Sequence, residues 1–202
     1  EGFYKAIKAN GNADGNIKLI LNFFEGQEDY YIYYIPHSYP EEKLYIEGIH
    51  TILFHGERTN PNAKVINSQF RATVNMVIKN ENAYEALLVD NHGRITEGSR
   101  SNVFFVKNDI LVTPPLAQVL PGITRAQILE IAKENKIEVQ ERYIDENELK
   151  EYQGAFISGT SPKVLPIKTI DSIKISSSDN ILVKKLMELY DNNIDKYIKK
   201  HK

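Results

Sequence analysis

The chain of 202 residues contains no cysteine. This absence excludes disulfide bonds, zinc–thiolate sites and catalysis by a thiol. No apolar run reaches the roughly 20 residues that a membrane-spanning helix needs, and the start of the chain has no signal-peptide pattern. We therefore expect a protein of the cytoplasm that does not associate with membranes.

The chain also lacks an excess of charge of either sign. It has 25 Lys and Arg residues against 27 Asp and Glu residues, a formal net charge of −2. Nucleic-acid binding needs a basic surplus, so no nucleic-acid partner is expected. The hydrophobic content of 42% and the charged content of 26% are typical of an ordered globular protein with a sizeable core. There is no internal repeat or heptad pattern.

The order of predicted elements indicates an α+β fold. Residues typical of strands, β-branched and aromatic, occur in runs between turn signals, and these runs are 17–24, 30–35, 45–54, 84–89, 94–96, 103–107, 110–112, 138–142 and 155–157. Helical spacing or caps predict helices at 67–79, 124–135 and 146–152. A last helix follows the polar segment 176–180, with the apolar stripe Leu182, Leu186, Leu189, Tyr190, Ile194 and Tyr197.

One segment is rich in glycine, proline and asparagine and marks the predicted domain boundary. It is the stretch Gly56-Glu-Arg-Thr-Asn-Pro-Asn62. We therefore expect a first domain at 1–55, a linker at 56–62 and a second domain at 63–202.

Two segments can form a binding site for a phosphorylated ligand. The first, Glu97-Gly-Ser-Arg-Ser-Asn102, leads into a predicted strand, and the second, Leu120-Pro-Gly-Ile-Thr-Arg125, precedes a predicted helix. A helix N-terminus offers free N–H groups and positive potential to a phosphate, and Thr124 can add its hydroxyl. Alternatively, Thr124 caps the helix with Gln127 completing a capping box, and Glu97 is an ordinary exposed glutamate in a hairpin.

These two segments belong to a set of four, with Pro61-Asn-Ala-Lys-Val-Ile-Asn67 and Ser158-Gly-Thr-Ser161. Their order and spacing resemble the class IV aminotransferases, a pyridoxal-phosphate family that includes branched-chain and D-amino acid aminotransferases and aminodeoxychorismate lyases. The resemblance implies a D-amino acid aminotransferase-like fold. Residues 1–55 then form the remainder of a small α/β domain. A large cofactor-binding domain follows, with mixed, mainly antiparallel strands and flanking helices.

The resemblance also implies roles for individual residues. Lys64, which alone would be taken for a solvated surface lysine, becomes the Schiff-base lysine that also moves the α-proton. Glu97 becomes the partner of the pyridine nitrogen. The implied cofactor is pyridoxal 5′-phosphate without a metal ion, and the other residues implied to bind it are Ser101, Asn102, Gly122, Ile123, Thr124, Gly159, Thr160 and Ser161. Asn67 matches many members or caps a helix, and the role of Arg100 stays open.

The activity implied by the resemblance is transfer of an amino group between an amino acid, preferably branched-chain, and a 2-oxo acid, in a homodimer. Two alternatives stay open: elimination of the aminodeoxychorismate lyase type on the same cofactor, and a truncated, inactive chain that retains the fold. The family's usual N-terminal segment, with an arginine that clamps the phosphate, has no counterpart before Glu1, so a truncated chain is expected. The segment Pro36-His-Ser-Tyr-Pro40 lacks the arginine of the D-amino acid enzymes, and His37 is more typical of a surface turn than of a substrate contact.

Overall fold

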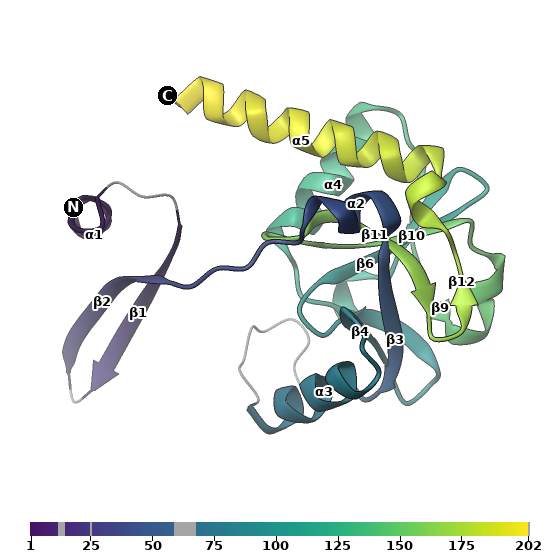
Figure 1. Cartoon of the computed structure of the whole chain (residues 1–202), viewed down its shortest axis with the longest axis horizontal. Coiled ribbons are helices and arrows are strands. Elements are labelled where there is room, and N and C mark those ends of the chain that lie inside the picture. Colours follow the sequence, from purple (N-terminus) through teal and green to yellow (C-terminus); the bar gives the residue numbers. More distant parts are fainter. Residues whose placement is uncertain (12–14, 25, 59–67, 202) are drawn as a thin grey trace. The chain divides into compact units, whose positions relative to one another are not determined.

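The computed structural model describes residues 1–11, 15–24, 26–58 and 68–201, which divide into two compact units, Glu1–Tyr39 and Pro40–Lys202 (Figure 1). The first unit contains the helix α1 (Gly2–Ala9) and an antiparallel pair of strands, β1 (Asn16–Phe24) and β2 (Gln27–Ile35). Both strands were predicted, whereas α1 was not.

The described residues of the second unit form one ten-stranded sheet. Its order is β8-β7-β6-β10-β11-β3-β4-β5-β9, and β12 pairs with β11. The strands are β3 (Ile49–His55), β4 (Glu85–Val89), β5 (Arg94–Gly98), β6 (Asn102–Lys107), β7 (Ile110–Thr113), β8 (Val139–Glu141), β9 (Ile144–Asp145), β10 (Gly154–Gly159), β11 (Lys163–Ile170) and β12 (Ile173–Lys174). Most neighbours are antiparallel, but β3 runs parallel to β11 and β4, and β7 runs parallel to β8. The prediction of a mixed, mainly antiparallel sheet is confirmed.

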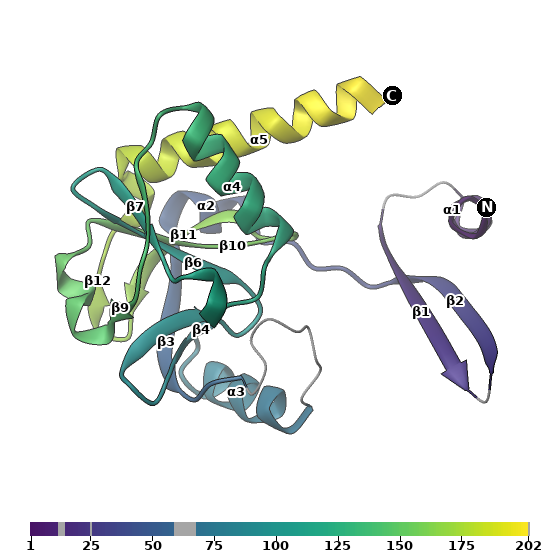
Figure 2. The same cartoon turned by 180° about the vertical axis from the view of Figure 1, so that it is seen from behind.

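Helices flank this sheet, as expected. They are α2 (Glu42–Glu47), α3 (Ser68–Asn80), α4 (Ile123–Glu134) and α5 (Ile181–His201), with the 3₁₀ turns η1 (Leu116–Gln118), η2 (Glu146–Glu151) and η3 (Ser177–Asp179). Figure 2 shows α4 and α5 on the same side of β6 and β10. The start of α5 is fixed by Asn180, whose Oδ1 accepts the N–H groups of Leu182 and Val183.

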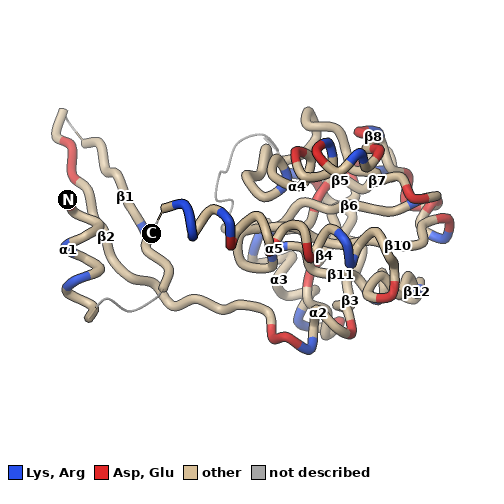
Figure 3. The backbone as a smooth tube through the Cα atoms, turned by 90° about the horizontal axis from the view of Figure 1, so that it is seen from above, with Lys and Arg blue, Asp and Glu red and all other residues tan. Residues whose placement is uncertain are grey.

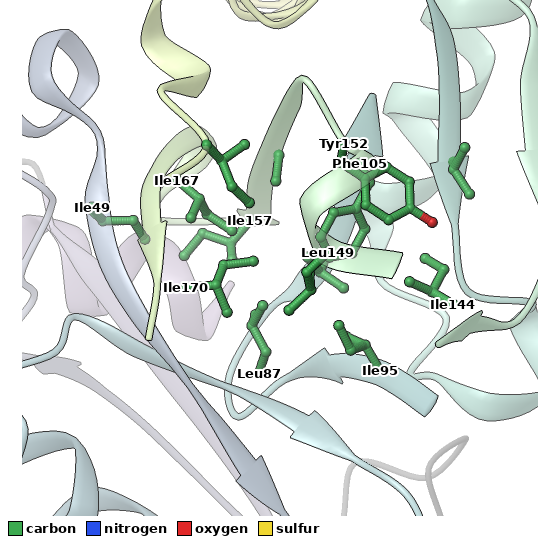
Figure 4. Packing of buried hydrophobic residues seen from close by; sticks show 14 of the residues in the cluster. Ile49, Leu87, Ile95, Phe105, Ile144, Leu149, Tyr152, Ile157, Ile167 and Ile170 are labelled. Carbon is green, nitrogen blue, oxygen red and sulfur yellow. The ribbon is translucent and has the colours of Figure 1, made fainter. Parts of the chain in front are cut away.

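The sheet separates two hydrophobic clusters because alternate residues of a strand point to opposite faces. On one face Phe105 and Ile157 pack with Leu149 of η2 and with residues from β4, β5, β9 and β11 (Figure 4). On the other face Phe104 and Phe156 stack with ring centroids 4.9 Å apart beneath α4 and α5. Asn102 and Ser158 lie on the same strand faces as this second pair, and this places them on the side of α4.

Two details of the sequence prediction are wrong. The strand expected at 45–54 starts later: residues up to Glu47 belong to α2, and Gly48 takes a positive φ of 76° before β3 begins at Ile49. Tyr197 was placed in the apolar stripe of the last helix but is exposed, because the packing of α5 ends near Ile194. The last turn of α5 is instead basic, with Lys199, Lys200 and His201 (Figure 3).

The compact units and the predicted domains divide the chain at different places. Residues 40–55 were predicted to belong with the first domain, whereas β3, within that segment, pairs with β11 and β4 in the large sheet. Part of the predicted linker, residues 59–62, lies outside the described residues. Among the described helices, none has the length and apolar character required to cross a membrane.

Candidate functional site

Glu97 lies at the end of β5 and is almost completely buried. Its side chain is 3% exposed, and both oxygens are engaged. Oε1 accepts a hydrogen bond from Arg58 Nη1 at 3.1 Å, and Oε2 accepts the backbone N–H of Leu120 at 3.0 Å. Burial raises the pKa of Glu97, while the Leu120 N–H and Arg58 oppose this rise. The alternative of an exposed hairpin glutamate is therefore wrong.

The turn after Glu97 is organised around a second buried carboxylate, Glu85 of β4. Glu85 Oε1 accepts the hydroxyl of Ser99 at 2.6 Å, and its Oε2 accepts the hydroxyl of Ser101 at 3.2 Å. The turn is closed by the N–H of Gly98, which donates to the Ser101 carbonyl at 2.8 Å. The Ser101 hydroxyl thus donates to Glu85, and its predicted role at the cofactor stays a prediction. Arg100 donates to the carbonyl of Tyr84 at 3.4 Å.

Asn102, at the start of β6, connects this turn to the start of α4. Its Nδ2 donates to the Leu120 carbonyl at 2.9 Å. The backbone of Leu120 therefore makes two of these hydrogen bonds: its N–H donates to Glu97, and its C=O accepts from Asn102. Gly122 lies against the same amide: a Cβ at this position would meet Asn102 Oδ1 at 2.3 Å. Only glycine fits here without displacing Asn102.

The helix α4 begins at Ile123 with Gly122 as its N-cap, and no side chain caps it. The capping box proposed for Thr124 and Gln127 is therefore wrong. Thr124 lies within the first turn and is buried, and Gln127 Oε1 accepts the hydroxyl of Tyr190 at 3.1 Å instead. The first N–H groups of a helix have no acceptor within it. The start of α4 consequently presents donors and positive potential close to Leu120.

A buried hydroxyl completes the polar surroundings of this helix start. Ser158 of β10 is paired with Asn102 across the sheet and is 1% exposed. Its Oγ has no hydrogen-bond partner among the described residues. A buried polar group without a partner is costly, so a ligand oxygen bound here would satisfy it. Gly159 ends β10, and the predicted residues Thr160 and Ser161 follow in the next turn, where Thr160 is exposed.

The structure thus brings together Glu97, Asn102, Gly122 and Thr124 through Leu120 and the start of α4. Two predicted positions, Lys64 and Asn67, lie outside the described residues. Ile123 is 79% exposed, so a contact with phosphate would come from its backbone. His37 belongs to the first unit, where it is exposed and its ring lies 5.1 Å from that of Tyr39.

Two residues of this region were missed by sequence reasoning. Glu85 opens the fully buried strand β4, and an acidic residue directly before Ala-Leu-Leu-Val was a usable signal, because an unpaired carboxylate is rarely buried. Arg58 lies in the predicted linker. Nothing in its local sequence indicates a partner 39 positions away.

The chain is also similar to known proteins. The sequence profile of the family described as Amino-transferase class IV matches residues 3–170. A probable branched-chain-amino-acid aminotransferase of Rickettsia conorii is 35% identical over 152 residues, which are 71% of this chain and 52% of that protein. The chain spans about half the length or less of the first curated relatives that it matches.

Solved structures are similar as well. The branched-chain amino acid aminotransferase of Escherichia coli superposes with a TM-score of 0.80 at 26% identity, covering 92% of this chain and 67% of that one. The T.th. branched-chain amino acid aminotransferase, solved with pyridoxamine 5′-phosphate, has a TM-score of 0.67 at 29% identity and covers 74% of this chain and 52% of that one.

Proposed function

Since the chain belongs to the class IV aminotransferase family, we propose that it carries the cofactor site of an enzyme that transfers an amino group between an amino acid and a 2-oxo acid with pyridoxal 5′-phosphate. The observation that carries the proposal is the chain of contacts from Glu97 through Leu120 to the start of α4. It joins Glu97, which could accept from a protonated ring nitrogen, to the N–H groups at the start of α4, which could donate to a phosphate.

The residues present suit this cofactor. Glu97 would accept the N–H of the pyridinium ring, because a carboxylate stabilises the positive charge there. The backbone N–H groups at Ile123 and Thr124, with the Thr124 hydroxyl, would bind the phosphate. The buried Ser158 hydroxyl is a further donor on the same side of the sheet. Gly122, Gly159, Thr160 and Ser161 would shape the rest of this phosphate site. When bound, the cofactor supplies an electron sink for the charge left when the α-proton departs.

In this proposal Lys64 binds the cofactor and transfers the substrate proton. A lysine amine can bind the cofactor aldehyde and then remove and return the proton at the substrate Cα, provided that its pKa is lowered enough for the neutral amine to form. The proposal rests for this residue on the family match, whose range includes position 64.

We favour a branched-chain amino acid as the amino donor because the curated relative and both solved structures carry that name. A homodimer located in the cytoplasm is part of the same proposal. Light scattering of the purified protein tests the first point, since a monomer at high concentration would contradict it, and cell fractionation tests the second.

The activity is tested by following 2-oxo acid-dependent consumption of leucine, isoleucine and valine with native protein, Lys64→Ala and Lys184→Ala. Lys184 is an exposed lysine of α5 and serves as the matched control. We expect turnover by the native protein and by Lys184→Ala, and none by Lys64→Ala. Release of pyruvate from aminodeoxychorismate without any transamination would replace the proposal by the lyase reaction. Absence of both activities despite cofactor binding would contradict it.

A further inference from the structure

The contact between Arg58 and Glu97 has no part in the site as proposed so far. Arg58 follows β3, and its side chain is only 19% exposed. Its Nη1 lies 3.1 Å from Glu97 Oε1, on the oxygen that the Leu120 N–H does not use. One oxygen is therefore oriented by the backbone near α4 and the other by a guanidinium from the segment that follows β3.

Glu97 needs such a partner because its surroundings favour the neutral carboxyl. Burial is the largest influence and raises its pKa, and the negative charge of Glu85 acts in the same direction. The groups that oppose this rise are the Leu120 N–H and Arg58. Among the described residues, Arg58 and Glu85 are the charged groups that act on Glu97, and Arg58 is the one of opposite sign.

We propose that Arg58 is a positioning residue, whose guanidinium keeps Glu97 ionised and directed so that it can accept the ring N–H of bound pyridoxal phosphate. This inference rests on the proposed function. A neutral carboxyl would present a donor of its own and could not balance a pyridinium charge. Arginine suits the task since it stays charged at all accessible pH values and its planar fork fixes direction. Its low exposure also limits screening by salt.

The test compares the affinity for pyridoxal phosphate of native protein, Arg58→Ala, Arg58→Lys, Glu97→Gln and the double variant Arg58→Ala/Glu97→Gln. We expect Arg58→Ala to weaken binding by about tenfold or more, and Arg58→Lys to restore part of the loss. In the Glu97→Gln background, Arg58→Ala should change affinity by less than about twofold, because a residue that acts through Glu97 has no effect without it. The matched control is Arg94→Ala, on the same strand as Glu97, whose guanidinium lies over the ring of Tyr143. It should bind like the native protein.

The pH profile gives a readout that a purely structural role would not change. Without Arg58, the carboxyl of Glu97 is expected to take up a proton at higher pH than in the native protein. The affinity of Arg58→Ala should therefore increase with pH more steeply than the affinity of the native protein does.

The outcomes separate this inference from the proposed function. If Glu97→Gln weakens binding and Arg58→Ala does not, the role proposed for Arg58 is wrong, whereas the proposed cofactor site is retained. If Arg58→Ala weakens binding equally in both backgrounds, Arg58 acts on the cofactor directly and the inference is likewise overturned. If neither Glu97→Gln nor Lys64→Ala affects binding, the proposed function itself is wrong.

Discussion

Replacing Gly122 by alanine tests whether the start of α4 depends on Asn102. The backbone at Gly122, with φ −66° and ψ 137°, suits alanine, so the change introduces no backbone strain. The new Cβ would lie 2.3 Å from Asn102 Oδ1, far inside any real contact. The Asn102 amide must move, and its hydrogen bond of 2.9 Å to the Leu120 carbonyl is then lost.

The expected cost follows from these contacts. Loss of the hydrogen bond with its buried groups left unpaired costs about 1–3 kcal/mol, and alanine in place of glycine at an N-cap adds about 0.5 kcal/mol. Gly122→Ala should therefore lower the free energy of unfolding by about 1.5–3.5 kcal/mol. Asn102→Ala loses the same bond and frees the space for the new Cβ. The double variant should then cost only about 0.5 kcal/mol more than Asn102→Ala alone, so the two changes are coupled by the shared bond term of about 1–3 kcal/mol.

Urea denaturation of the four proteins gives these values from the transition midpoints, provided that the slopes agree. A titration of the same proteins with pyridoxal phosphate shows whether the affinity for the cofactor falls together with the free energy of unfolding. We expect the affinity of Gly122→Ala to fall because the phosphate donors move with the start of α4. Fully additive costs in the double variant, or native stability in Gly122→Ala, would refute the reasoning.

Three further predictions concern the core, the pH response and an ion pair in which only the arginine is buried. Phe156→Ala should cost about 3–5 kcal/mol in urea denaturation, because it removes a fully buried ring stacked on Phe104; a cost below about 1 kcal/mol would contradict this packing. Burial raises the pKa of Glu97 above the ordinary value of 4.5, so the stability that this group contributes is present at acid pH and lost as the pH rises through its folded pKa. Glu97→Gln should therefore raise the urea midpoint of the cofactor-free protein at about pH 8 and leave it unchanged at about pH 4; equal effects at both values would contradict the shift. Arg125 is buried and pairs with the more exposed Glu141 at 2.6 Å. Glu141→Ala leaves the buried guanidinium charge without this partner and bonded to the Pro114 carbonyl, so it should destabilise the protein more than Arg125→Met, which removes the charge. The reverse order of urea midpoints would contradict this.

The sequence predicted most strands and helices of the second unit because their apolar periodicity is strong and local. The helix at 181–201, for example, follows from its stripe of leucines and from the cap at Asn180. The start of β3 was not predictable in this way, since Tyr45 and Ile46 have strand-forming side chains but lie in a helix that ends at Glu47. Tyr45 packs against the hydrophobic core from this helix, whereas Ile46 is exposed, so their intrinsic strand preference does not decide the element.

The candidate site was predicted as a set of residue types and not as a set of contacts. The family resemblance selected Glu97 and Thr124, but the bond from Glu97 to the Leu120 N–H depends on how two distant segments meet. The capping box failed for a local reason, because Gly122 rather than Thr124 ends the extended backbone before α4. Arg58 was missed because only the folded chain brings it close to Glu97. Glu85 had a local signal, its place before a buried apolar run, but its serine partners could not be read from the sequence.

The central claim is that pyridoxal phosphate binds between Glu97 and the start of α4 and is held by Lys64. Borohydride reduction of the protein after incubation with pyridoxal phosphate, followed by peptide mass mapping, tests it directly. Reduction fixes the cofactor to the amine that binds it. The account predicts one predominant label, on Lys64, that is lost in Lys64→Ala and retained in Lys184→Ala. A label spread over exposed lysines, or a predominant label on another residue, would contradict it.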